Sequence, residues 1–161
     1  MFEKIPAELK AVPNWVCWRL LPDAERGKPR KVPYDPRSGK AAASNDPATW
    51  CDFDTAVSAA NDYNGVGFMF GNSPYFGVDI DGVADELPRY MEGEPGLLSD
   101  FVDALQSYTE LSTSGTGIHI ICRGKLPQGG RRHGNIDMYE SGRFFVLTGR
   151  SVSQDPDIVD C

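Results

Sequence analysis

Several signals that place a protein in a membrane, outside the cell or around a zinc ion are missing from this chain. No apolar run approaches the roughly 18 residues of a membrane-spanning helix, so we expect no membrane contact. The first residues, MFEKIPAELK, lack the apolar core of a signal peptide, which predicts a protein of the bacterial or host cytoplasm. Neither a zinc site nor a disulfide framework is expected, because there is no CxxC and no Cys/His cluster. The cysteines are Cys17, Cys51, Cys122 and Cys161.

Basic residues are also in short supply, with 16 Lys and Arg against 23 Asp and Glu and a formal net charge of −7. Such a balance argues against a nucleic-acid partner. The charges are segregated, however, since residues 26–40, RGKPRKVPYDPRSGK, contain six basic residues and one acid. A solvated surface is the simpler interpretation of any single Lys or Arg, but the segregation favours binding of a polyanion. A second basic group comprises Arg123, Lys125, Arg131, Arg132 and Arg143.

Periodic patterns predict a single α/β (α+β) domain over residues 1–161. Apolar residues recur at helical spacing over residues 46–63, after an Asp-Pro helix start, and again over residues 96–106, GLLSDFVDALQ. A short helix is expected near the start of the chain. Seven or so short strands separated by Gly- and Pro-rich turns predict a mixed or antiparallel sheet. The basic stretch is expected to form a long hairpin whose arms include KVPYD.

The segment FGVDIDGV, residues 76–83, has two aspartates inside an apolar run. Side chains alternate along a strand, so Asp79 and Asp81 share one face. Two neighbouring carboxylates repel each other and are costly to bury, so that face must hold a cation or be open to water. An EF-hand calcium loop does not explain the pair, because Gly82 follows the second acid directly and the neighbours are typical of a strand.

A third acid, Asp137, interrupts a later apolar strand in NIDMYESGRFF. Hard divalent cations such as Mg²⁺ prefer a few carboxylates together with phosphate oxygens. Asp79, Asp81 and Asp137 are therefore the candidate metal ligands.

The turn in STSGTGIHI, residues 112–120, offers hydroxyls and backbone N–H groups suited to holding an anion. A polar hairpin turn with a solvent-facing histidine is the simpler interpretation of this stretch alone, since neither a Walker loop nor GxGxxG is present. Arg143, just after a Ser-Gly turn, is a fork-shaped donor suited to phosphate. The candidate phosphate-binding residues are Ser112, Ser114, Gly115, Thr116, Gly117, His119 and Arg143, which the family resemblance given below implies are nucleotide-binding.

Together these residues predict a phosphoryl-transfer site. Two metal ions can stabilise the attacking and leaving oxygens of an in-line displacement, while His119 and Arg143 hold the other phosphates. The basic hairpin would hold a polynucleotide backbone. The candidate catalytic residues are Asp79, Asp81, Asp137 and His119, and the candidate DNA-binding residues are Lys28, Arg30 and Lys31.

The same residues resemble the three-motif pattern of the archaeo-eukaryotic primase superfamily: DID, the histidine of SGTGIHI and the acid of NIDMYESGRFF. The chain is most similar to the bifunctional DNA primase–polymerase domains of phages and plasmids. That similarity is carried by an ordered set of strings, KPRKVPYD, DPATW, SYTELSTSGTGIHI and YESGRFFVLTG. One departure is Gly117, which stands where the pattern has Ser.

The resemblance implies a primase–polymerase catalytic core with an RNA-recognition-motif-like mixed sheet, flanked by helices, and a small α/β module. It implies template-directed nucleotidyl transfer in phage or plasmid DNA replication, dependent on Mg²⁺ or Mn²⁺ with two ions per site. The partners would be a single-stranded DNA template, a primer and nucleoside triphosphates. Larger members add a helical bundle and often a helicase, so the chain is expected to be the N-terminal fragment of a larger replication protein.

Two other functions remain open. The chain could be a non-catalytic module that binds single-stranded DNA or nucleotides through aromatic stacking, in which the acids are incidental. It could also be a metal-dependent nuclease, which would use similar carboxylates but has little need for a triphosphate-binding turn.

Overall fold

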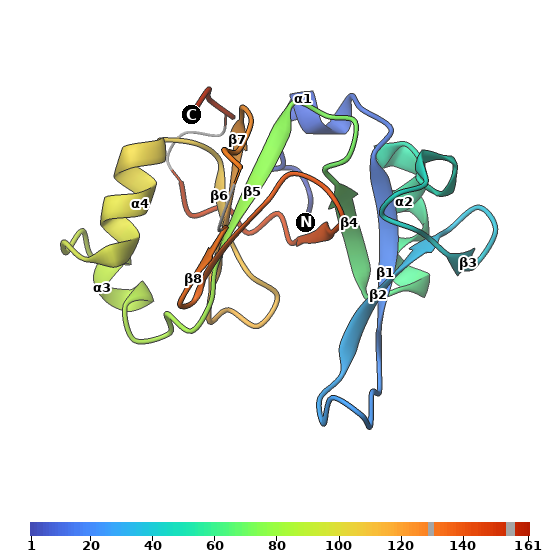
Figure 1. The fold of residues 1–161 in the computed structure, drawn as a ribbon, viewed down its shortest axis with the longest axis horizontal. Coiled ribbons are helices and arrows are strands. Elements are labelled where there is room, and N and C mark those ends of the chain that lie inside the picture. Colours follow the sequence, from blue (N-terminus) through green and yellow to red (C-terminus); the bar gives the residue numbers. More distant parts are fainter. Residues whose placement is uncertain (129–130, 154–156) are drawn as a thin grey trace. The chain divides into compact units, whose positions relative to one another are not determined.

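The computed structural model describes residues 1–128, 131–153 and 157–161. The chain folds into two compact units, each built from segments that are not contiguous in the sequence (Figure 1). Each unit combines a five-stranded sheet with short helices, which confirms the α/β fold class. The first unit comprises Met1–Pro6, Asn72–Glu140 and Thr148–Cys161, and the second comprises Ala7–Gly71 and Ser141–Leu147.

The sheet of the second unit has the strand order β10-β4-β1-β2-β3, and its neighbouring strands are antiparallel. The first two strands of the chain form the hairpin that the sequence predicts around the basic stretch. The bounds are β1 (Trp15–Leu21), β2 (Arg30–Asp35), β3 (Lys40–Ala41), β4 (Gly65–Met69) and β10 (Phe144–Leu147).

The hairpin extends beyond the rest of its sheet (Figure 1). β4 pairs with β1 only as far as Trp18, whereas β2 continues to pair as far as Leu21. The outer part of the hairpin is therefore a two-stranded ribbon, here called the β1–β2 ribbon, whose connecting residues 22–29 are mostly exposed.

Aromatic rings fill the core of the second unit. Trp15 is fully buried and meets Phe53 and Phe68 edge-on, at centroid distances of 4.9 and 5.2 Å. Phe70 makes a similar contact with Phe145 at 4.9 Å. A fully buried ring stabilises a fold by roughly 1.5–3 kcal/mol. These aromatics therefore serve the core and are not a platform for nucleic-acid bases.

The continuous helix predicted over residues 46–63 is wrong in its middle. The chain straightens at Cys51, whose backbone N–H and C=O both pair with Trp15 at 2.8 and 2.9 Å. Asp52 then caps a new helix by accepting a hydrogen bond from the Thr55 N–H at 2.8 Å. Backbone pairing with the first strand thus outweighs the helical periodicity. The helical elements of this unit are α1 (Ala7–Lys10), η1 (Pro47–Thr49), α2 (Phe53–Ala59) and η2 (Ala60–Asp62).

The sheet of the first unit has the strand order β6-β7-β5-β9-β8. Two helices connect β5 to β6, and the β6–β7 hairpin then returns so that β7 pairs with β5, while β9 pairs with the other side of β5. This is the split βαβ order of an RNA-recognition-motif-like sheet. The bounds are β5 (Tyr75–Ile80), α3 (Leu87–Met91), α4 (Leu97–Leu105), β6 (Thr109–Leu111), β7 (Ile118–Arg123), β8 (Arg132–His133) and β9 (Ile136–Tyr139).

The mixed sheet that the resemblance implies is antiparallel here. All pairs between the named strands of both units are antiparallel. Among the described residues, a parallel pairing occurs only at an isolated bridge between Arg123 and Asp160.

Helices α3 and α4 cover one face of the first unit's sheet. Val78 and Ile80 of β5 are fully buried in a cluster with Leu98 and Val102 of α4, which confirms the amphipathic helix predicted over residues 96–106. Because side chains alternate along β5, Asp79 projects from the opposite face. No helix in the described part of the chain is long and apolar enough to cross a bilayer.

Candidate active site

Asp79 lies on the central strand of the first unit's sheet, between two strands that each carry a predicted site residue. The strand registers set it opposite His119 on β7 and opposite Asp137 on β9. Directly opposed residues of antiparallel strands project from the same face, so the structure brings these three side chains together. The register continues outward and forms a row across all five strands, here called the polar row: Glu110, His119, Asp79, Asp137 and Arg132.

Side-chain nitrogen atoms of His119 and Arg132 flank the two acids at the centre of the polar row. The His119 Nε2 atom lies 3.6 Å from Asp79 Oδ1, and the Arg132 Nε atom lies 3.8 Å from Asp137 Oδ1. The two aspartates face each other as like charges, a pairing that destabilises a sheet. Both keep 20% of their side-chain surface exposed. This face therefore presents carboxylate oxygens that keep some contact with solvent.

Two members of the polar row were not predicted as site residues: Arg132, which was named only within a basic group, and Glu110. The Glu110 side chain is fully buried, and its carboxylate accepts hydrogen bonds from the N–H groups of Thr148 at 2.8 Å and Gly149 at 2.9 Å. The Tyr108 hydroxyl donates a third bond at 2.8 Å. Burial and the neighbouring carboxylate raise the pKa of Tyr108, so it remains a donor. The missed signal was an acid inside the predicted strand SYTELS, the same signal that singled out Asp137.

Asp81 follows β5 directly and is exposed. Its N–H donates to the Asn135 carbonyl at 3.0 Å, and the Asn135 side-chain amide donates back to the Asp81 carbonyl at 2.6 Å. Gly117 lies on the other side, where a Cβ atom would come within 2.6 Å of the Ile80 carbonyl oxygen and 3.3 Å of Asp81 Oδ1. The departure of Gly117 from the Ser of the family pattern thus has a steric reason in this chain.

Asp79, Asp81 and Asp137 offer the carboxylate oxygens that Mg²⁺ and Mn²⁺ prefer; the register sets Asp79 opposite Asp137 on one face, and Asp81 follows the end of β5. Within residues 1–128, 131–153 and 157–161, no three His, Cys, Asp or Glu side chains are gathered closely enough to hold a metal ion. The donor chemistry fits a hard divalent cation.

The predicted anion-binding turn is held by its own hydroxyls. Ser114 Oγ lies 2.7 Å from Thr116 Oγ1 and 3.3 Å from Ser112 Oγ. The N–H groups of Gly115 and Gly117 donate to the carbonyl and hydroxyl oxygens of Ser112, at 3.0 and 3.1 Å. Gly115 has φ +75°, a conformation that favours glycine. The hydroxyl-bearing residues at 114 and 116 are exposed, so they can reach a ligand.

Arg150 fixes this turn from outside. Its guanidinium donates hydrogen bonds to the carbonyls of Ser112 and Thr113. Its own carbonyl accepts from the Leu111 N–H at 2.9 Å, and the Thr148 hydroxyl donates to the Leu111 carbonyl at 2.7 Å. The segment after β10 therefore supports both Glu110 and the turn.

Four predicted site residues belong to the second unit, whereas the others belong to the first. Arg143, Lys28, Arg30 and Lys31 are exposed. Arg30 Nε lies 3.7 Å from an Asp23 carboxylate oxygen, and the Lys31 ammonium lies 5.7 Å from the centre of the Trp18 ring. The three predicted DNA-binding residues thus cluster on the β1–β2 ribbon.

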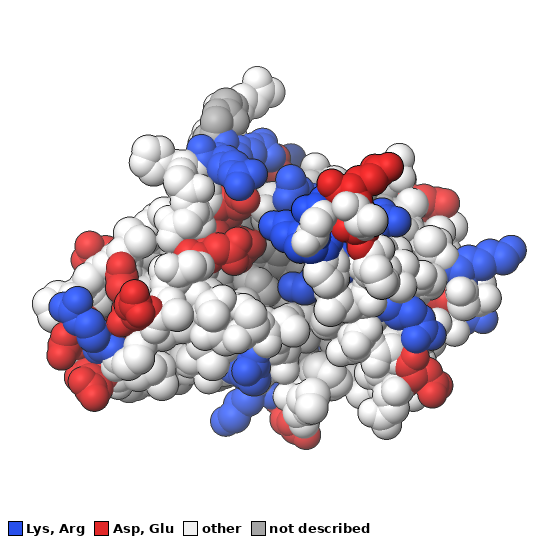
Figure 2. Space-filling view, turned by 90° about the horizontal axis from the view of Figure 1, so that it is seen from below, with Lys and Arg blue, Asp and Glu red and all other residues white. Residues whose placement is uncertain are grey.

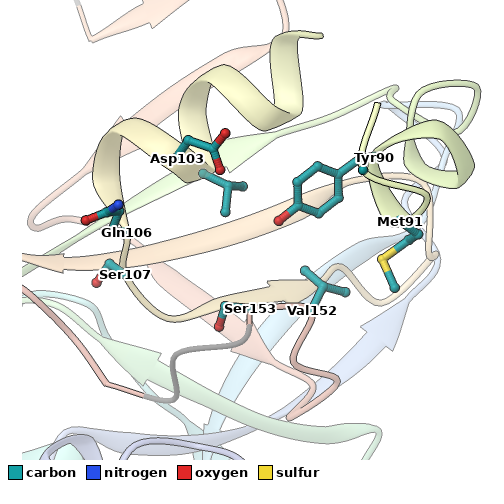
Figure 3. Close-up of a pocket in the computed structure, with 9 residues that line it drawn as sticks. Tyr90, Met91, Asp103, Gln106, Ser107, Val152 and Ser153 are labelled. Atoms are coloured by element: carbon teal, nitrogen blue, oxygen red, sulfur yellow. The ribbon is translucent and has the colours of Figure 1, made fainter. Parts of the chain in front are cut away.

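A cavity of about 430 Å³ occurs elsewhere in the first unit (Figure 3). It is lined by α3, α4 and residues 152–153, and the Tyr90 ring reaches into it. Burial and the charge of Asp103 raise the pKa of Tyr90. Acidic side chains gather around α3 and α4 on the face shown in Figure 2. None of the predicted site residues lines this cavity, so we do not assign it to the site.

No family model matches the chain. A curated protein, the DNA primase-polymerase of Nitratiruptor phage NrS-1, is 36% identical to it over 170 aligned residues. The match covers 98% of this chain, which spans 22% of the length of that relative.

Proposed function

The chain is homologous over nearly its whole length to one part of a phage DNA primase-polymerase, as its motifs predict, and we propose that it is a primase–polymerase catalytic core. In this proposal it adds nucleotides to the 3′ end of a primer on a DNA template. The observation that carries the proposal is the register that sets Asp79 between His119 and Asp137 on one face of the sheet.

We propose that Asp79, Asp81 and Asp137 hold Mg²⁺ or Mn²⁺. Such ions, when bound, neutralise the triphosphate and stabilise the charge that develops at the α-phosphate. Without a cation, the partly exposed carboxylates would repel a triphosphate. The acids therefore provide the ion-binding half of the site.

The remaining side chains bind and orient the nucleotide and the DNA. His119 can donate to phosphate oxygens from the centre of the sheet. Ser114 and Thr116 can donate from the turn, which ends at Gly117 beside Asp81. Positioning of this kind, together with electrostatic stabilisation, accounts for most of the catalysis in phosphoryl transfer. The basic side chains of the β1–β2 ribbon would hold the polynucleotide through its phosphates.

The test is extension of a labelled primer on a DNA template, with Mg²⁺ or Mn²⁺ and with deoxy- or ribonucleotides supplied separately. The parent chain should extend the primer, and the Asp79→Ala, Asp81→Ala double variant should not. A matched variant, Asp100→Ala, Asp103→Ala, removes two exposed acids of α4 and should retain extension. Loss of activity in both double variants would point to a general effect of charge, and DNA hydrolysis without nucleotide would indicate a nuclease.

A second candidate is a binding module without catalysis. One observation favours it: the described acids and histidines are not gathered into a three-ligand cluster. Titration with a nucleoside triphosphate, with and without divalent ion, separates the two functions. Ion-dependent binding supports the catalytic core, and DNA binding that ignores both nucleotide and ion supports the module.

A further inference from the structure

We propose that Glu110 is a positioning residue that fixes the ring of His119 for binding the triphosphate of the incoming nucleotide. The inference rests on the proposed nucleotidyl-transfer function. Glu110 lies directly opposite His119 in the β6–β7 register, and its Oε1 atom is 3.5 Å from His119 Nδ1.

Packing alone does not explain a carboxylate at this position. Glu110 is fully buried, and an apolar residue of similar volume is often at least as stable in such a place. The chain keeps the charge and surrounds it with donors, namely two backbone N–H groups and the Tyr108 hydroxyl. The carboxylate is thus rigidly held before any ligand arrives.

A rigid carboxylate at one ring nitrogen decides where the other nitrogen points. Glu110 faces Nδ1, so Nε2 is turned toward the centre of the sheet, where it lies 3.6 Å from Asp79. Carboxylates that accept a hydrogen bond from one nitrogen of a functional histidine orient the other in the same way. His119 is itself buried, with 7% of its surface exposed, so the ring has little freedom to reorient.

The kinetic test is Glu110→Gln, which keeps the shape and one acceptor oxygen but removes the charge. We expect the KM for the incoming nucleotide to rise roughly tenfold, with kcat changed less than about threefold. Glu92→Gln is the matched control, because it makes the same substitution at an exposed residue outside the site. Its KM should stay within about twofold of the parent.

A double-mutant cycle separates positioning from a general structural role. If Glu110 acts through His119, then Glu110→Gln should change the KM little in a His119→Ala background. An unchanged KM in the parent background would overturn the proposal. A rise of the same size in both backgrounds would also overturn it, because the effect would then not pass through His119.

A spectroscopic measurement tests the contact between Glu110 and His119 without an activity assay. In the ¹⁵N spectrum of the nucleotide-free parent chain, His119 should carry a proton on Nδ1. His119→Ala assigns the signal, and the exposed His133 serves as the reference. A bare Nδ1 would overturn the proposal even if Glu110→Gln failed to fold. If the parent extended no primer but showed this proton, the proposed function would fail while the pairing stood.

Discussion

Asp79 and Asp137 face each other directly across β5 and β9. An antiparallel sheet favours opposite charges at such a pair and is destabilised by like charges. The chain therefore keeps two carboxylates where folding alone would favour one or neither. Conflicts of this kind between folding and charge placement are expected at functional sites.

Removing one of these acids should stabilise the fold and abolish the activity. Asp137→Asn relieves the repulsion and is expected to raise the free energy of unfolding by about 0.5 kcal/mol. Its ion pair with the mostly exposed Arg132 is worth little. Primer extension should fall by about 10²–10³-fold. Urea unfolding and extension assays test both effects, with Asp100→Asn as the surface control. Full activity in the variant would remove Asp137 from the proposed site.

Gly117 should not accept the serine of the family pattern. In Gly117→Ser the new Cβ meets the Ile80 carbonyl oxygen, which is backbone and cannot move away cheaply. We expect a loss of about 1–3 kcal/mol in stability, measured by urea unfolding, together with weaker extension as Asp81 is displaced. The control is Gly115→Asn, since nothing lies within 4 Å of a Cβ there and Asn tolerates the positive φ. Equal stability of the two variants would contradict the steric explanation.

The basic residues of the β1–β2 ribbon should account for a defined part of the salt dependence of DNA binding. Replacing Lys28, Arg30 and Lys31 by Gln removes up to three phosphate contacts. The slope of log affinity against log salt for single-stranded DNA should then become shallower by about 2. Fluorescence anisotropy over a range of salt concentrations measures it. A Lys4→Gln, Arg89→Gln variant, which changes exposed basic residues outside the stretch of residues 26–40, should leave the slope unaltered. Equal slopes for parent and triple variant would exclude the ribbon from DNA binding.

Acid stability should depend on Asp35. Arg37 donates to both carboxylate oxygens of this buried side chain, at 3.0 and 2.9 Å, and these bonds hold its pKa below the ordinary value of 3.8. A lowered folded-state pKa stabilises the fold at pH values above 3.8, and this stabilisation is lost as the pH falls toward the folded-state pKa. Urea midpoints between pH 7 and pH 2.5 should therefore fall less steeply in Asp35→Asn than in the parent.

Arg37→Gln should also make the urea midpoint fall less steeply at acidic pH, because it removes the bonds that lower the pKa of Asp35. If Asp35→Asn had this effect on the urea midpoint and Arg37→Gln did not, another partner of Asp35 would have to be responsible for its lowered pKa.

The sequence was most informative where a residue conflicted with its surroundings. Asp79 and Asp137 were found because charge interrupts an apolar strand, and alternation then predicted which residues share a face. Glu110 carried the same signal but stood beside a polar turn, where an acid is unremarkable by composition. The break at Cys51 could not be predicted, since it depends on backbone pairing with Trp15, more than thirty residues earlier. The alternation of side chains along a strand also does not reveal which strands pair with each other. For example, β4 and β5 are close in the sequence but belong to different sheets.

The two units are interleaved, because the chain passes between them after residues 6, 71, 140 and 147. β10, which pairs with β4, is therefore made only after the whole first-unit segment between them. During synthesis the edge of β4 that pairs with β10 lacks that partner until residues 144–147 have left the ribosome. A nascent chain stopped before residue 144 would expose that edge and be prone to self-association. Neither unit can be exchanged between relatives as one uninterrupted stretch of gene.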